Sequence, residues 1–89
     1  MVTAPSEQAF SETYAAARQK FLALAAERSA IVNSAVHPTE RGAGGEELAI
    51  DLATFGDPDA ERTLLLVSGT HGQEAFLGSA LQIAFCATW

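Results

Sequence analysis

Apolar residues recur at helical spacing in the first third of the chain, between Ser11 and Arg28. A stripe of this kind is typical of a helix that buries one face. Ser11 is the expected N-cap, and Arg28 suits the negative end of the helix dipole. The pattern predicts a helix over residues 11–28. Its apolar face consists of Tyr14, Ala17, Phe21, Leu24 and Ala25, and its polar face carries Glu12, Arg18, Gln19 and Glu27.

Two strand patterns follow. The stretch ELAIDLATF, residues 47–55, alternates apolar side chains with small or acidic ones, which indicates a half-buried strand. The run TLLLV, residues 63–67, has no alternation, as is typical of a strand covered on both faces. We expect the two strands to be antiparallel neighbours joined by residues 56–62. Residues 36–47 contain Pro38 and three glycines and predict a turn-rich connection.

The last element is a helix beginning at about Gln73 that is apolar nearly all the way round. Such a helix needs cover on every side, and the remaining residues offer few elements to provide it. We therefore expect an α/β fold that is incomplete: a tail over residues 1–10 and then, over residues 11–89, the N-terminal part of a larger domain.

Charge and composition exclude several classes of function. The 89 residues carry a net charge of −6, which disfavours binding to nucleic acid and to anionic membranes. The longest uncharged segment, residues 75–89, is shorter than the roughly 20 apolar residues of a membrane span. No secretory signal is evident, so a cytoplasmic location is expected. The lone Cys86 lies at helical spacing among apolar residues and is expected in the core.

The corner between the second predicted strand and the last helix carries the candidate chemistry. Gly69 and Gly72 suit a sharp turn. His71 and Glu74 are spaced i, i+3, which puts an imidazole and a carboxylate on the same side, and both are good zinc ligands. In the alternative interpretation, Glu74 interacts with free amides at the helix start and His71 is an ordinary loop residue.

Other site motifs are absent from this corner. SGTHGQEA lacks the lysine of a phosphate-binding loop and the glycine spacing of a dinucleotide fingerprint, and the chain has no Gly-x-Ser-x-Gly elbow. A hydrophobic strand ending in His-Gly does resemble the oxyanion-hole loop of serine α/β-hydrolases. That class of enzyme is kept as an alternative.

The segments SETYAAARQKFLALA, ELAIDLATFG and ERTLLLVSGTHGQEAFLGSALQ together resemble the start of a zinc carboxypeptidase-like domain. The closest resemblance is to an uncharacterised bacterial branch, a domain of unknown function with the signature Ser-Gly-Thr-His-Gly-x-Glu. The wider superfamily includes zinc carboxypeptidases and the succinylglutamate desuccinylase and aspartoacylase enzymes. The resemblance covers the chain from about Phe10 and only the opening part of the family's domain.

This resemblance implies a mixed sheet covered by helices, of which the chain would supply the N-terminal helix, the first strands and the first crossover helix. It implies that His71 and Glu74 are the first two Zn²⁺ ligands. A third ligand, a general-base glutamate and substrate-binding arginines are expected later in the domain. Complete relatives would hydrolyse an amide bond in a small peptide or an N-acyl amino acid. The 89 residues alone are therefore expected to be inactive.

Two further expectations concern His37 and possible partners. His37 precedes Pro38 and is interpreted as a loop residue, either a turn residue or a contact at the edge of a pocket, rather than a metal ligand. The non-enzymatic alternative is a truncated chain or a partner-dependent one, which associates with another chain to cover its last helix.

Overall fold

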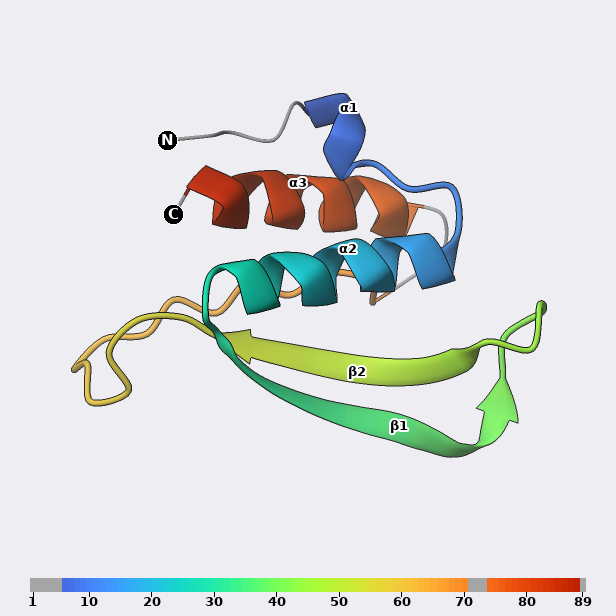
Figure 1. The fold of residues 1–89 in the computed structure, drawn as a ribbon, viewed down its shortest axis with the longest axis horizontal. Coiled ribbons are helices and arrows are strands. Elements are labelled where there is room, and N and C mark those ends of the chain that lie inside the picture. Colours follow the sequence, from blue (N-terminus) through green and yellow to red (C-terminus); the bar gives the residue numbers. More distant parts are fainter. Residues whose placement is uncertain (1–5, 71–73, 89) are drawn as a thin grey trace.

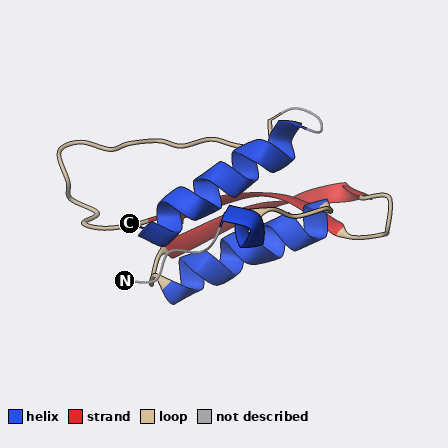
Figure 2. Cartoon of the chain, turned by 90° about the horizontal axis from the view of Figure 1, so that it is seen from above, coloured by secondary structure: helices blue, strands red, loops and turns tan. Residues whose placement is uncertain are grey.

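The computed structural model describes residues 6–70 and 74–88, which form three helices and two strands. In chain order these are α1 (Ser6–Ala9), α2 (Tyr14–Glu27), β1 (Ile31–Arg41), β2 (Glu47–Thr54) and α3 (Glu74–Thr88). The strands form an antiparallel two-stranded sheet. Figure 1 shows the three helices stacked on one side of this sheet, and Figure 2 shows the same arrangement from above. The predicted α/β class is confirmed.

Helix α2 begins later than the sequence pattern predicts. The N-cap is Thr13, whose hydroxyl accepts a hydrogen bond from the Ala16 amide at 3.1 Å. The prediction of Ser11 as the N-cap is therefore wrong. The Ser11 hydroxyl is buried and has no hydrogen-bond partner in the part of the chain that the structure describes. At the other end, Arg28 is the C-cap residue, one position beyond the last helical residue.

The core lies between the helices and is built from small side chains. Ala9 of α1 packs against Ala80 and Ile83 of α3, and these residues are at most 5 % exposed. Leu24 of α2 packs against the same cluster. Alanine allows the helix backbones to approach closely, so a small cluster suffices to hold the three helices together. The sequence pattern did not anticipate α1.

The C-terminal end of α3 is held by the residue that ends α2. Arg28 donates from Nη2 to the Ala87 carbonyl at 2.9 Å and from Nε to the Cys86 carbonyl at 3.4 Å. The last carbonyls of a helix have no partner within the helix, and a cation there also suits the helix dipole. Arg28 thus caps α3 in addition to ending α2.

The inward face of β2 is the small and acidic one. Asp51 and Ala53 are less exposed than Ile50 and Leu52, which are 78 % and 50 % exposed. Strand β2 is half-buried as the alternation predicts, but its large apolar side chains point away from the helices. The physical reason is the ion pair between Asp51 and Arg18 of α2. A shift of the strand by one residue would turn Asp51 to the other face and break this pair.

Strand β1 extends through the segment that the sequence pattern assigns to a connection. Val36, His37 and Pro38 all lie within β1, so the prediction of a loop at His37 is wrong. The pairing with β2 is irregular between Val36 and Arg41. A proline lacks the amide that a regular ladder needs, and an irregular stretch of an edge strand tolerates it. The turn itself is shorter, over residues 42–46, and Gly45 adopts a φ of 82° there.

The predicted second strand does not form in the described structure. Residues 63–67 have no helix or strand assignment, and β2 pairs with β1 instead. Leu64, Leu65 and Val67 are each about 70 % exposed, at 70 %, 69 % and 72 %. An apolar run of this kind needs cover on both faces, and within residues 6–70 and 74–88 no element provides it.

Helix α3 confirms the predicted final helix, with Leu77 and Leu81 exposed and Ala80 and Ile83 buried. Among the described residues, no helix combines the length and apolarity needed to cross a membrane.

Candidate functional site

The candidate corner lies where residues 63–70 lead into α3. The chain runs alongside α3 in the direction opposite to the helix (Figure 2) and turns at Gly69, whose φ is 77°. A residue with a side chain adopts that conformation at a cost, which explains a glycine at this position. Helix α3 then begins at Glu74, close to the predicted start at Gln73. His71, Gly72 and Gln73 lie outside the described residues.

Gln82 of α3 binds the segment that leads into the corner, residues 66–68. Its amide nitrogen donates to the Leu66 carbonyl at 2.9 Å, and its amide oxygen accepts from the Ser68 hydroxyl at 2.9 Å. Ser68 also lies close to Gly78, where an added Cβ would stand 3.4 Å from the Ser68 Cβ. The side chain of Gln82 therefore holds residues 66–68 to α3, the helix that starts at Glu74. Nothing in the sequence pattern predicts this role for Gln82.

Of the predicted metal pair, Glu74 is the first residue of α3, and His71 lies outside the described residues. The described residues contain no cluster of three or more His, Cys, Asp or Glu side chains that could hold a metal ion. A two-ligand pair would need further ligands from elsewhere to complete a zinc site.

His37, the other histidine, is engaged locally. Its Nδ1 accepts hydrogen bonds from the Glu40 amide at 3.0 Å and the Thr39 amide at 3.3 Å. The ring thus satisfies the backbone at the irregular part of β1. This is the role of a turn residue, which the sequence analysis favoured over a metal ligand, although the segment belongs to a strand.

A second cluster joins α2 to β2. Arg18 donates from Nε to Asp51 Oδ2 at 2.9 Å and from Nη2 to Asp51 Oδ1 at 3.2 Å, and its Nη1 contacts Glu47 Oε1 at 2.9 Å. Ser34 of β1 donates to Asp51 Oδ1 at 2.6 Å. Arg18, which the sequence pattern places off the apolar stripe of the helix, faces the sheet. The signal in the sequence is Asp51, an acidic residue within an otherwise apolar strand pattern, which indicates that a cation lies opposite.

Tyr14 adds a second link between the same elements. Its hydroxyl donates to the Ala49 carbonyl and accepts from the Ala49 amide, each at 2.9 Å. Ala49 is thereby bonded on both backbone groups to one side chain. Tyr14 and Arg18 are four residues apart and so lie on one face of α2.

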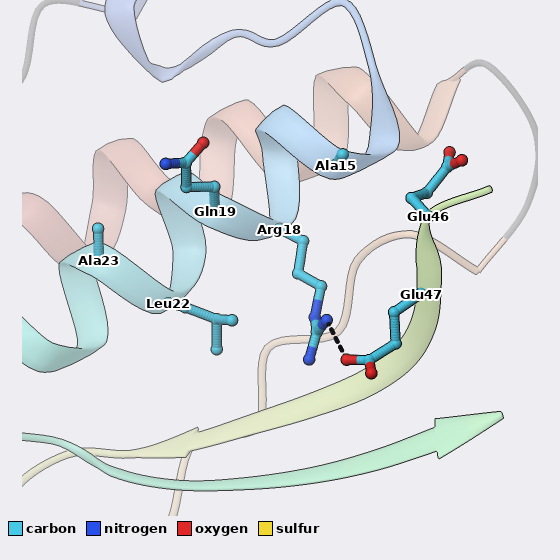
Figure 3. A pocket seen from close by; sticks show the side chains of 7 residues that line it. All are labelled: Ala15, Arg18, Gln19, Leu22, Ala23, Glu46 and Glu47. Atoms are coloured by element: carbon cyan, nitrogen blue, oxygen red, sulfur yellow. Dashed lines mark hydrogen bonds and ion pairs between the residues drawn. The ribbon is translucent and has the colours of Figure 1, made fainter. Parts of the chain in front are cut away.

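Figure 3 shows the depression beside this cluster, with Arg18 pointing from α2 towards Glu47. Its volume is about 480 Å³, and its lining consists of Ala15, Arg18, Gln19, Leu22, Ala23, Glu46 and Glu47. The guanidinium of Arg18 is already bonded to two carboxylates, those of Glu47 and Asp51. We interpret the cluster as a structural clamp between helix and sheet.

The clamp perturbs the acidity of its members. Partial burial acts to raise the pKa of Asp51, but hydrogen bonds from Arg18 and Ser34 outweigh it and hold that pKa below its usual value. Hydrogen bonds to Asp51 and then to Glu47 raise the pKa of Arg18 further. In α3, burial raises the pKa of the free thiol of Cys86, against the opposing charge of Arg28, which suits the predicted packing role.

Comparison with known proteins gives one match. Residues 10–89 match the sequence profile of a family described as "Protein of unknown function (DUF2817)". The match begins at the residue where the resemblance noted in the sequence begins. No curated protein and no solved structure matches the chain significantly.

Proposed function

Since the chain belongs to the DUF2817 family of proteins of unknown function, we propose that it supplies two zinc ligands, His71 and Glu74, to a zinc-dependent amide-bond hydrolase. The observation that carries the proposal is the start of α3 at Glu74, in the segment that follows the turn at Gly69. In open α/β sheets, ligands bind at the carboxyl ends of strands, and the sequence of residues 63–67 has the pattern of a strand covered on both faces.

The donor types support this assignment. An imidazole and a carboxylate are both established zinc ligands, and a spacing of three positions lets them reach one ion. Bound zinc in hydrolytic sites lowers the pKa of a coordinated water towards neutrality, which produces a nucleophile near pH 7. Gln82 contributes by holding Leu66 and Ser68 against α3, the helix that begins at Glu74.

The site needs residues beyond this pair. Hydrolytic zinc sites use three protein ligands and leave one position for water. The third ligand and the general base would come from further polypeptide, and the 89 residues alone would not turn over substrate. By resemblance, the substrate class is a small peptide with a free carboxylate or an N-acyl amino acid.

Zinc affinity, measured in a longer polypeptide that contains this chain together with the further ligands, tests the ligand assignment. Competition with a chromophoric chelator is expected to show that His71→Ala and Glu74→Gln each weaken zinc binding by about tenfold or more. His37→Ala is the matched control and should leave the affinity unchanged, because the Nδ1 of His37 is already bonded to the backbone. Equal affinity of wild type and His71→Ala would refute the assignment. If a longer family member hydrolyses its substrate at the same rate with and without a chelator, the serine-hydrolase alternative is favoured.

A further inference from the structure

One side chain of α3 holds the segment that precedes the candidate corner. The amide nitrogen of Gln82 donates to the Leu66 carbonyl, and its amide oxygen accepts from the Ser68 hydroxyl, each at 2.9 Å. The donor and the acceptor of the amide are therefore both engaged on residues 66–68. Because an amide presents these two groups in one plane, the two bonds fix the orientation of the segment as well as its distance from the helix.

Gly78 lets the segment lie directly against the helix. An added Cβ at Gly78 would stand 3.4 Å from the Ser68 Cβ, which is van der Waals contact, so a larger side chain would push the segment away. Gly78 and Gln82 are four positions apart and lie on one face of α3. Residues 66–68 are thus seated on one face of the helix over about one turn.

The contact spans the corner that follows. Residues 69–73 connect Ser68 to Glu74 in the sequence. Ser68 is bonded to Gln82, and Glu74 belongs to the same helix as Gln82, so both ends of this connection are attached to α3. Fixing the two ends of a loop removes conformational entropy at folding, and that entropy is then not lost again when the loop binds a ligand.

We propose that Gln82, acting through Ser68, is a positioning residue of the candidate zinc site. It sets the separation between the end of residues 63–68 and the start of α3, the two points between which the zinc ligands are placed in the sequence. Both polar groups of the Gln82 amide are engaged on Leu66 and Ser68, so Gln82 itself is not a metal ligand. This inference rests on the proposed function, because it concerns the same zinc site.

A purely structural role for Gln82 predicts a different result. Bonds that only stabilise the fold lower the free energy of unfolding when they are removed, and they leave the zinc affinity of the folded protein unchanged. Bonds that hold a metal site in its binding geometry change the affinity itself, typically by ten- to hundredfold. Asp51→Ala separates the two effects, because it breaks the contact between α2 and β2 and leaves both bonds of Gln82 in place.

Zinc affinity is measured by chelator competition in a longer polypeptide that contains this chain together with the further ligands. Gln82→Leu removes both bonds and keeps a side chain of similar size, and it should weaken zinc binding by about tenfold. Ser68→Ala is the milder change, which removes one bond and should weaken binding by about threefold. Added to Gln82→Leu, it should cause no further loss, because its bond is already absent. Asp51→Ala should bind zinc as wild type does.

Each other outcome assigns the failure. Wild-type affinity in Gln82→Leu, together with weakened binding in His71→Ala, would overturn the positioning role and leave the ligand assignment intact. Equal losses in Gln82→Leu and Asp51→Ala would show an effect of general stability and would also overturn it, as would additive losses from Ser68→Ala and Gln82→Leu. Equal affinity of wild type and His71→Ala would refute the ligand assignment and this inference with it.

Discussion

Arg18 of α2 holds Asp51 of β2 through two hydrogen bonds, at 2.9 Å and 3.2 Å, and Ser34 donates to the same carboxylate. The side chains of Arg18 and Asp51 are 18 % and 8 % exposed. A two-point contact between a guanidinium and a carboxylate fixes orientation as well as distance. This pair therefore decides which face of β2 meets the helix.

Removing the carboxylate should destabilise the chain. Asp51→Ala leaves Arg18 without its main partner in a partly buried position, and we expect the free energy of unfolding to fall by about 2 kcal/mol, between the values for exposed and buried pairs. Urea denaturation measures the change. Asp59→Ala, in an exposed turn, is the control and should change stability by less than about 0.5 kcal/mol. Similar losses in both variants would show that the pair contributes little.

The same pair predicts a loss of stability in acid. The pKa of Asp51 is lower in the folded state than its ordinary value of 3.8. The unfolded chain therefore binds more protons in this window, so the stabilisation is present above about pH 4 and is lost as the pH falls towards the folded-state pKa. Urea midpoints measured between about pH 6 and pH 3 should fall less steeply in Asp51→Ala than in wild type. Parallel curves would contradict the prediction.

The two candidate N-caps of α2 can be separated by substitution. Thr13→Ala removes the hydrogen bond to the Ala16 amide and should cost about 1 kcal/mol. Ser11→Ala removes a buried hydroxyl without a partner among the described residues, so it should be neutral or slightly stabilising. Thermal denaturation of both variants checks the order. If Ser11→Ala is the more damaging change, the helix begins where the sequence pattern predicts.

Gln82 should control access to residues 63–67. Gln82→Ala removes the bonds to Leu66 and Ser68, and a protease that cleaves beside apolar residues should then cut this segment about fivefold faster. Mass spectrometry of the first products locates the cut. Gln19→Ala, on the exposed side of α2, is the control and should be cleaved at the wild-type rate.

Local sequence patterns predict which helices and strands form better than they predict what each face of an element contacts. The periodicity of α2, the apolar run of α3 and the alternation of β2 are local features of the sequence, and the structure contains all three elements. The local sequence does not predict which face of β2 points towards the helices, because the inward position of Asp51 depends on Arg18, 33 positions away. Pro38 and the three glycines predict a turn-rich connection, and only the pairing of β1 with β2 shows that an irregular strand continues through Pro38.

The candidate site is predicted from residue type and spacing, and the structure confirms only the start of the helix beside it. Helix α3 starts at Glu74 after a turn at Gly69, close to the predicted position. Zinc binding by His71 and Glu74 stays a prediction. The role of Gln82 could not be predicted, since an amide side chain in an apolar helix carries no signal about the segment that it contacts.

The contact between Arg28 and the Ala87 carbonyl has a kinetic consequence, because it joins residues 59 positions apart. Paired residues of β1 and β2 are separated by only six positions, as for Arg41 and Glu47, up to 23 for Ile31 and Thr54. Closing a longer loop costs more entropy, so we expect the hairpin to form early and the end of α3 to dock late. Arg28→Gln should then speed unfolding several-fold and leave the refolding rate nearly unchanged in stopped-flow experiments. A slower refolding rate would instead place the docking of the two long helices before the rate-limiting barrier.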